Sequence, residues 1–115
     1  MDSKVKKYIL ISSFDKVDFI KTDQIICCIA DGRYTSIFTL DGKQYVACQN
    51  LGKYESDLGD EFFFRIHQSY IVNIAHINRI KKNEGFFCEM TNNMRLPISN
   101  RKHKVFCEFI GLKIM

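Results

Sequence analysis

The sequence of 115 residues predicts a mainly β domain with two short helices, and three observations lead to this expectation. Asp31-Gly32 and Asp41-Gly42, which are favoured hairpin turns, separate three segments rich in β-branched and aromatic residues. Three further strand-like segments follow after residue 76. Two other segments instead space their apolar residues along one face of a helix. The expected fold is therefore two three-stranded antiparallel meanders with two short helices.

Strands are expected on both sides of these turns. An edge hairpin comes first, from residues 8–13 and 16–20. The first meander takes residues 25–30, 33–40 and 43–48, and the second takes residues 77–82, 86–91 and 94–99. Because proline cannot donate a backbone hydrogen bond, Pro97 is expected at a sheet edge or at the end of its strand.

Two helices complete the pattern. The first links the meanders, and it is expected to begin at the N-cap residue Asn50 and to end at Gly59. The second begins near Ser99 or Asn100 and ends near Gly111. Its buried face is expected to carry Val105, Phe106, Phe109 and Ile110.

Length and composition fit a single cytoplasmic domain. Residues 1–115 form one domain by length, 46% of the residues are hydrophobic, and ten Phe and five Tyr supply much of the core. Residues 1–7 are expected to be flexible. No apolar run approaches the roughly 20 residues that cross a membrane, and the apolar segment near the N-terminus is too short for a signal peptide.

Basic residues are concentrated in the second half of the chain. Residues 1–61 carry eight Lys or Arg and ten Asp or Glu, whereas residues 62–115 carry nine Lys or Arg and three Asp or Glu. The two halves therefore have net charges of −2 and +6, which agree with the +4 of the whole chain. Such an imbalance points to a polyanionic partner, although a basic surface that only keeps the domain soluble has the same composition.

The cysteines predict neither disulfides nor a metal site. They are odd in number and form no CxxC pair: Cys27, Cys28, Cys48, Cys88 and Cys107. We expect small buried hydrophobic residues in a reducing compartment. Cys27 and Cys28 are neighbours in a strand, so their side chains face opposite sides of the sheet. Cys107 is expected to be the most exposed, since it lies about 100° round the helix from a core position.

The start of the second helix has an unusual charge. A helix N-terminus carries about half a positive charge, so its first turn favours Asp and Glu. Here the segment SNRKHK contains Arg101, Lys102 and Lys104, and no acidic residue precedes Glu108. A phosphate bound by free backbone N–H groups and these cations would offset the positive charge that gathers at this helix end. The alternative is a helix face that is simply solvated.

A second polar segment interrupts two apolar runs. It consists of His67, Gln68 and Ser69, with Arg65 just before it. A lone histidine is more often structural, but the trio together predicts a hydrogen-bonding loop. In such a loop Gln can pair bidentately with adenine and Ser can bind a phosphate.

A third segment leaves the first hairpin turn. It contains Arg33, Tyr34 and Thr35. Arg33 is expected to be exposed, whereas the sequence leaves Tyr34 open between the core and the surface.

No set of residues predicts an enzyme, a metal site or a cofactor. His67, His76 and His103 do not fall at metal-ligand spacing with one another or with the cysteines. No glycine-rich phosphate loop is present. The sequence selects no nucleophilic Cys–His pair, which leaves a small hydrolase of that kind as the most distant alternative.

The central segment FFRIHQSYIVNIAHINRIKK resembles the signature of LytTR-type DNA-binding domains, the output domains of bacterial LytR/AlgR-family response regulators. The matching residues are Phe64, Arg65, His67, Gln68, Ser69, Tyr70, Val72 and Asn73. Residues 29–45, 49–58 and 96–109 resemble the family's first meander, its connecting helix, and its closing strand and helix. The resemblance runs from about Tyr8 to the end of the chain.

This resemblance implies an elongated stack of small antiparallel sheets whose loops enter successive major grooves of duplex DNA. The positions that it assigns to base reading are Tyr34, Gln68 and Asn100. The family often has Arg at the last of these, and here the arginine lies one residue later, at Arg101. The set implied for phosphate contacts and loop support is Arg65, His67, Ser69, Lys102 and Lys104, and Arg33 and Thr35 beside Tyr34 complete the candidate contacts.

The resemblance also implies a function and partners. These are sequence-specific binding of double-stranded DNA by a bacterial transcription regulator, at paired direct repeats, with a second copy on the DNA. Family members usually follow a receiver domain or a membrane segment, so the chain is either a free-standing regulator or an excised C-terminal domain. The alternative is a protein-interaction or RNA-binding β module that keeps the scaffold without the DNA role.

Overall fold

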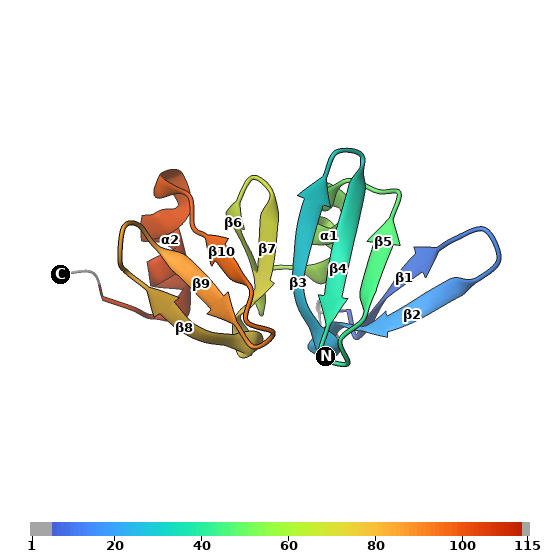
Figure 1. Ribbon diagram of the computed structural model, residues 1–115, viewed down its shortest axis with the longest axis horizontal. Coiled ribbons are helices and arrows are strands. Elements are labelled where there is room, and N and C mark those ends of the chain that lie inside the picture. Colours follow the sequence, from blue (N-terminus) through green and yellow to red (C-terminus); the bar gives the residue numbers. More distant parts are fainter. Residues whose placement is uncertain (1–5, 114–115) are drawn as a thin grey trace, which may run out of the picture.

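The computed structural model describes residues 6–113, which form three small antiparallel sheets and two α-helices (Figure 1). The strands are β1 (Tyr8–Ser12), β2 (Val17–Lys21), β3 (Ile25–Asp31), β4 (Tyr34–Thr39), β5 (Gln44–Ala47), β6 (Phe63–His67), β7 (Tyr70–Asn73), β8 (Ile77–Lys81), β9 (Phe87–Met90) and β10 (Arg95–Pro97). The helices are α1 (Leu51–Leu58) and α2 (Asn100–Ile110), and short 3-10 turns span Thr22–Gln24 and Ile74–His76. The sheets lie in a row along the longest of the three extents, 50 × 36 × 24 Å, which confirms the mainly β, elongated stack.

The middle sheet is larger than the sequence predicts. The expected meander of β3, β4 and β5 is present, but the sheet has five strands in the order β5-β4-β3-β7-β6. The added β6–β7 hairpin pairs with β3, with Cys28 opposite Ile71. No local pattern in the sequence indicates this pairing, because it joins segments more than 40 residues apart. The predicted three-stranded meander is therefore present as part of a larger sheet.

The other two sheets agree with the prediction. The β1–β2 hairpin forms a sheet of its own, and β8, β9 and β10 form the second three-stranded meander. Strand β10 is at the edge of that meander, and Pro97 is its last residue. The missing N–H of proline therefore leaves no gap in the middle of a sheet.

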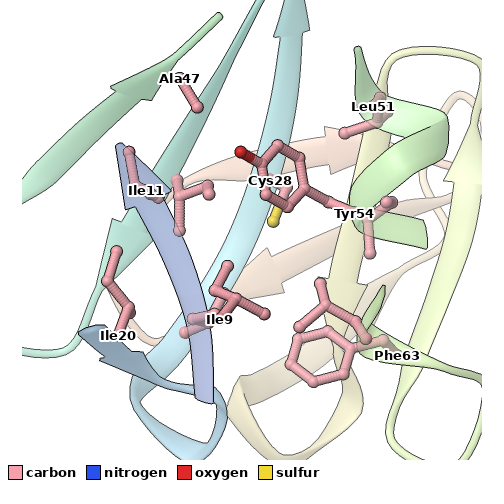
Figure 2. Packing of buried hydrophobic residues seen from close by; sticks show 12 residues of the cluster. Ile9, Ile11, Ile20, Cys28, Ala47, Leu51, Tyr54 and Phe63 are labelled. Atoms are coloured by element: carbon pink, nitrogen blue, oxygen red, sulfur yellow. The ribbon is translucent and has the colours of Figure 1, made fainter. Parts of the chain in front are cut away.

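Each face of the five-stranded sheet buries a separate core. On one face lie α1 and the β1–β2 hairpin, where Ile9, Tyr54 and Cys28 pack together (Figure 2). The other face packs against the three-stranded sheet and α2, where Phe106 and Cys27 belong to the second core. The neighbours Cys27 and Cys28 thus point to opposite faces, as the alternation of side chains along a strand predicts.

Both helices begin and end where the sequence predicts. The side chain of Asn50 accepts a hydrogen bond from the Lys53 N–H at 3.0 Å. Ser99 accepts one from the Lys102 N–H at 3.3 Å. Gly111 follows α2 with a φ of 80°, a left-handed conformation that glycine adopts without strain.

Helix α2 is rotated relative to the expected orientation. Phe106 is fully buried as predicted, and Phe109 and Ile110 are half-buried. Val105 is 53% exposed, however, whereas Cys107 is 3% exposed. The expectations for both residues are wrong for the same reason: the buried stripe runs through 106 and 107 instead of 105 and 106. Apolar residues flank Phe106 on either side, so the spacing alone does not fix the rotation.

Residues 1–5 of the segment expected to be flexible lie outside the described residues. The carbonyl of Lys6 accepts a hydrogen bond from the Thr22 hydroxyl at 2.8 Å. The carbonyl of Lys7 accepts one from the Thr22 N–H at 3.0 Å. These two residues are therefore fixed beside the end of β2. Within residues 6–113, neither helix has the length and apolar character that crossing a bilayer requires.

The cysteines provide a test of the two cores. Only Cys48 is exposed, and burial raises the pKa of the Cys27 and Cys88 thiols to about 12, which suppresses the reactive thiolate. We expect a thiol reagent at mildly alkaline pH to modify one cysteine per chain rapidly and the others only after unfolding. Cys48→Ser should remove the rapid reaction and Cys107→Ser should leave it unchanged. A rapid reaction that survives Cys48→Ser would contradict the described packing.

Candidate nucleic-acid interface

Three loops lie along one edge of the molecule, at the top of Figure 1: the β3–β4 turn, the β6–β7 turn and the start of α2. Main-chain hydrogen bonds connect them. The Ala30 N–H donates to the Ser69 carbonyl at 2.9 Å, and the Ser99 N–H donates to the Ile66 carbonyl at 2.9 Å. The structure therefore brings together the three segments that the sequence analysis singled out.

The β3–β4 turn exposes two of the candidate residues. Asp31 pairs with Tyr34, so the two central turn residues are Gly32 and Arg33, and Asp31 belongs to the strand. Gly32 has a φ of 61°, the positive value that the first central position of a type II′ turn requires. Arg33 is exposed, as predicted. Tyr34 is 48% exposed, which places it at the surface instead of in the core.

Thr35 has a structural role in this turn. Its side chain is fully buried, and its hydroxyl donates a hydrogen bond to the Gln49 carbonyl at 2.8 Å. This bond connects the start of β4 to the loop that leads into α1. As placed here, the hydroxyl is not available to DNA.

The β6–β7 turn is held by two side chains from β6. The Arg65 guanidinium donates to the Gln68 carbonyl from Nε at 3.2 Å and from Nη2 at 2.6 Å. The Ser69 N–H donates to Nδ1 of His67 at 3.0 Å, and the His67 ring lies 4.9 Å from the Tyr70 ring. Gln68 itself has an exposed side chain. The main chain of the turn is therefore fixed while the amide faces outward.

A β-bulge explains how Arg65 and His67 reach the turn from different sides. The register between β6 and β7 shifts between Arg65 and His67, which makes the buried Ile66 an extra residue. In a regular strand residues i and i+2 share a face. Here Arg65 extends towards Glu55 of α1, whereas His67 packs on Tyr70, which belongs to the core on the opposite face.

The start of α2 presents positive charge. Asn100, Arg101 and Lys104 are exposed, and the first turn contains no acidic residue. Lys102 is half-buried, with its Nζ 5.9 Å from the centre of the Phe64 ring. Among the described residues, the cations Arg101, Lys102 and Lys104 form no ion pair, and neither does Arg33. Their charge is therefore available to an external anion.

Two contributors to this edge were missed by sequence reasoning. The loop before α1 lines a concave surface with both turns, formed by Ala30, Gly32, Asn50, Leu51, Gly52, Arg65, Gln68 and Ser69. The sequence identifies Asn50 only as a helix cap. Glu55 of α1 receives a hydrogen bond from Arg65 Nη1 at 3.0 Å. Neither the spacing nor the composition of the sequence indicates either contact.

The described residues offer little for catalysis. Sγ of Cys107 and Nε2 of His103 lie 3.6 Å apart, but Cys107 is buried and the His103 ring stacks on Phe86 with centroids 3.7 Å apart. A substrate has no access to that sulfur. Within residues 6–113, no group of three or more His, Cys, Asp or Glu side chains is placed to hold a metal ion. What the edge presents is a phenol, two amides and cations, which are groups for binding.

Comparison with known families and structures agrees with this geometry. The family model of the LytTr DNA-binding domain matches residues 15–111. Among solved structures, the LytTr DNA-binding domain of a methyl-accepting/DNA response regulator from Bacillus cereus superposes with a TM-score of 0.81. The match covers 93% of this chain and 99% of that domain at 23% sequence identity, so it concerns the fold.

Curated relatives are longer proteins. The transcriptional regulatory protein LytR of Staphylococcus aureus is 32% identical over 100 residues, which are 85% of this chain and 40% of that protein. The CO-responsive transcriptional regulator RcoM of Rhodospirillum rubrum is 33% identical over 71 residues, which are 62% of this chain and 30% of that protein. The chain spans well under half the length of the relatives that it matches.

The buried Thr35 hydroxyl gives a prediction that separates support from recognition. Thr35→Val keeps the shape of the side chain but leaves the Gln49 carbonyl without its donor. We expect the free energy of unfolding, measured by urea denaturation, to fall by about 1 kcal/mol. Thr91→Val, at an exposed position, is the control and should have almost no effect. An unchanged stability in Thr35→Val would show that the hydroxyl does not support the turn.

Proposed function

This chain belongs to the family of LytTr DNA-binding domains, and we propose that it binds double-stranded DNA sequence-specifically through the edge where its three loops meet. One observation carries the assignment of the site. Three segments distant in the sequence place exposed polar side chains along a single edge, together with cations that form no ion pair within residues 6–113. Such an edge suits a duplex, which presents base edges flanked by phosphates.

Base reading is assigned to one side chain from each loop. Tyr34, Gln68 and Asn100 are all exposed, on the β3–β4 turn, the β6–β7 turn and the first position of α2. The amides of Gln and Asn can pair bidentately with adenine in the major groove. Arg101, the next residue of α2, is equally exposed and can contact guanine. We assign the third reading position to Asn100, with Arg101 as its neighbour at the same groove.

The remaining candidates divide between phosphate contact and support. Arg33, Lys104 and the half-buried Lys102 carry charge without an ion-pair partner in residues 6–113, which fits phosphate binding. The Ser69 hydroxyl is assigned to the same role. Because their polar groups already bond within the loops, Thr35, Arg65 and His67 are assigned to loop support.

The proposal extends to the setting of the domain. Because the relatives are named as transcriptional regulators, we assign residues 1–115 as one domain that serves transcription regulation in the bacterial cytoplasm, without a catalytic step. A receiver or sensor domain in the same or a partner protein would supply the signal. Two copies on paired direct repeats would double the contact with DNA.

Selection on random duplexes tests the proposed function directly. Repeated binding and amplification should enrich one duplex sequence, with two half-sites if two copies bind. Recovery of single-stranded RNA in a parallel selection, with no enrichment among duplexes, would instead identify an RNA-binding module. Failure to enrich any nucleic acid would leave the domain as a protein-interaction module and reject the proposal.

The charge of the second half predicts a steep dependence on salt. Neutralising about four to six phosphates should give a slope of roughly −4 to −5 in a plot of log affinity against log salt concentration, because counterions are released. Titration of a labelled duplex at several salt concentrations measures this slope. A flat plot would remove phosphate contact, and with it the assigned cations, from the mechanism.

Residues that read bases and residues that contact phosphates should respond differently to substitution. Gln68→Ala should cost about 1–3 kcal/mol on the selected duplex and relax preference at one base position, since an amide that reads one base is lost. Lys104→Gln should weaken selected and random duplexes alike, because a phosphate contact carries no sequence information. Competition binding with both duplexes measures both effects. Equal weakening of both duplexes by Gln68→Ala would exclude this turn from base reading.

A further inference from the structure

We propose that Glu55 of α1 is a positioning residue for base recognition, which acts through Arg65 on the main chain of Gln68. The inference rests on the proposed function, because it concerns how the Gln68 amide is oriented towards DNA. Glu55 lies in α1, outside the three loops and outside the central segment, residues 63–82, that carries the family signature. Its role follows from the contacts that connect α1 to the β6–β7 turn.

The peptide unit between Gln68 and Ser69 is held at both ends. Its carbonyl oxygen accepts hydrogen bonds from Nε and Nη2 of Arg65 at 3.2 Å and 2.6 Å. Its N–H group donates to Nδ1 of His67 at 3.0 Å. The bulge at Ile66 sends these two side chains to opposite faces of the hairpin, so they fix the peptide plane from both sides. The direction in which the Gln68 side chain leaves the backbone is set by that plane.

Glu55 completes this arrangement by fixing the arginine. The third contact of the guanidinium is from Nη1 to Oε1 of Glu55, at 3.0 Å. Because the guanidinium is planar, a carboxylate on Nη1 orients the Nε and Nη2 donors towards the Gln68 carbonyl. The Arg65 side chain is 25% exposed and the Glu55 side chain 48%, so the pair lies at the surface. An ion pair of this kind adds little to stability. Its contribution is therefore to orient the Arg65 guanidinium.

These contacts also argue against Arg65 as a simple phosphate anchor. Three of its five N–H donors are already used, and a carboxylate offsets its charge. Bidentate reading of a base needs the side chain within about 0.5 Å of its productive position. A freely rotating Arg65 would leave the turn with several conformations, and Gln68 would then contact different bases with similar affinity.

Charge-matched variants of α1 test the proposal. Glu55→Gln removes one carboxylate that contacts Arg65. Asp57→Asn removes another from the same helix, one that pairs with Lys53 at 3.0 Å and makes no contact with Arg65. We expect Glu55→Gln to lower the ratio of affinities for selected and random duplexes about threefold to tenfold, whereas Asp57→Asn keeps the ratio of the parent. Taking the ratio cancels the common effect of a lost negative charge on binding to a polyanion.

Two further variants separate positioning from charge and from a general loss of structure. Arg65→Lys keeps the positive charge but lacks the planar fork, so it should keep the affinity for random duplexes and lose the preference for the selected one. In a Gln68→Ala background, Glu55→Gln should have no additional effect on the ratio, because its target is already absent. A defect that arose from the fold alone would persist in that background.

The outcomes distinguish the two proposals. If no duplex is selected, the proposed function fails before Glu55 is tested. If the selected duplex is bound and Glu55→Gln keeps the parental ratio, the positioning role alone is overturned. Arg65→Lys with parental affinity for both duplexes would likewise overturn it, since charge would then suffice.

Discussion

The pairing of β3 with β7 determines the position of every other part of the site. It places Cys28 opposite Ile71 and continues beyond the last strand pair through the hydrogen bond from the Ala30 N–H to the Ser69 carbonyl. This last bond lies between the two turns that carry Tyr34 and Gln68. Both turns therefore end at the same level, and their exposed side chains face one edge. A one-residue shift in this register would move one turn relative to the other and flip the side chains of β7 to the wrong face.

A buried asparagine fixes the opposite end of the same strand pair. Nδ2 of Asn73 donates to the Ile25 carbonyl at 2.9 Å, and its Oδ1 accepts from the Ala75 N–H at 3.0 Å. The side chain is only 2% exposed, so these bonds are protected from water. A buried donor or acceptor that lost its partner here would lower the stability of the fold. Together with a core on each face of the sheet, they give the loops a rigid support. A module that recognises DNA through short loops depends on such support, because the loops have few contacts of their own.

Local signals predicted most of the fold, and non-local contacts account for what they missed. Glycine at the turns and the capping side chains of Asn50 and Ser99 act over a few residues, so the sequence revealed them. The addition of β6–β7 to the middle sheet depends on complementarity between distant strands, which no local pattern records. The rotation of α2 follows from packing against β6, so Val105 and Cys107 exchanged their expected environments.

The same distinction applies to the site. The sequence and the family resemblance identified the residues of the β6–β7 turn, but not which side chain faces outward and which ones support the main chain. In the structure Gln68 is the exposed member of the turn's polar trio, whereas Arg65 and His67 bond to the main chain beside it. The bulge at Ile66 produces this division, because it sends one supporting side chain to each face of the hairpin. On the proposed function, substitution of the exposed Gln68 should therefore change which DNA sequence is preferred. Substitutions at Arg65, His67 or Glu55 should change how well the loop discriminates any sequence at all.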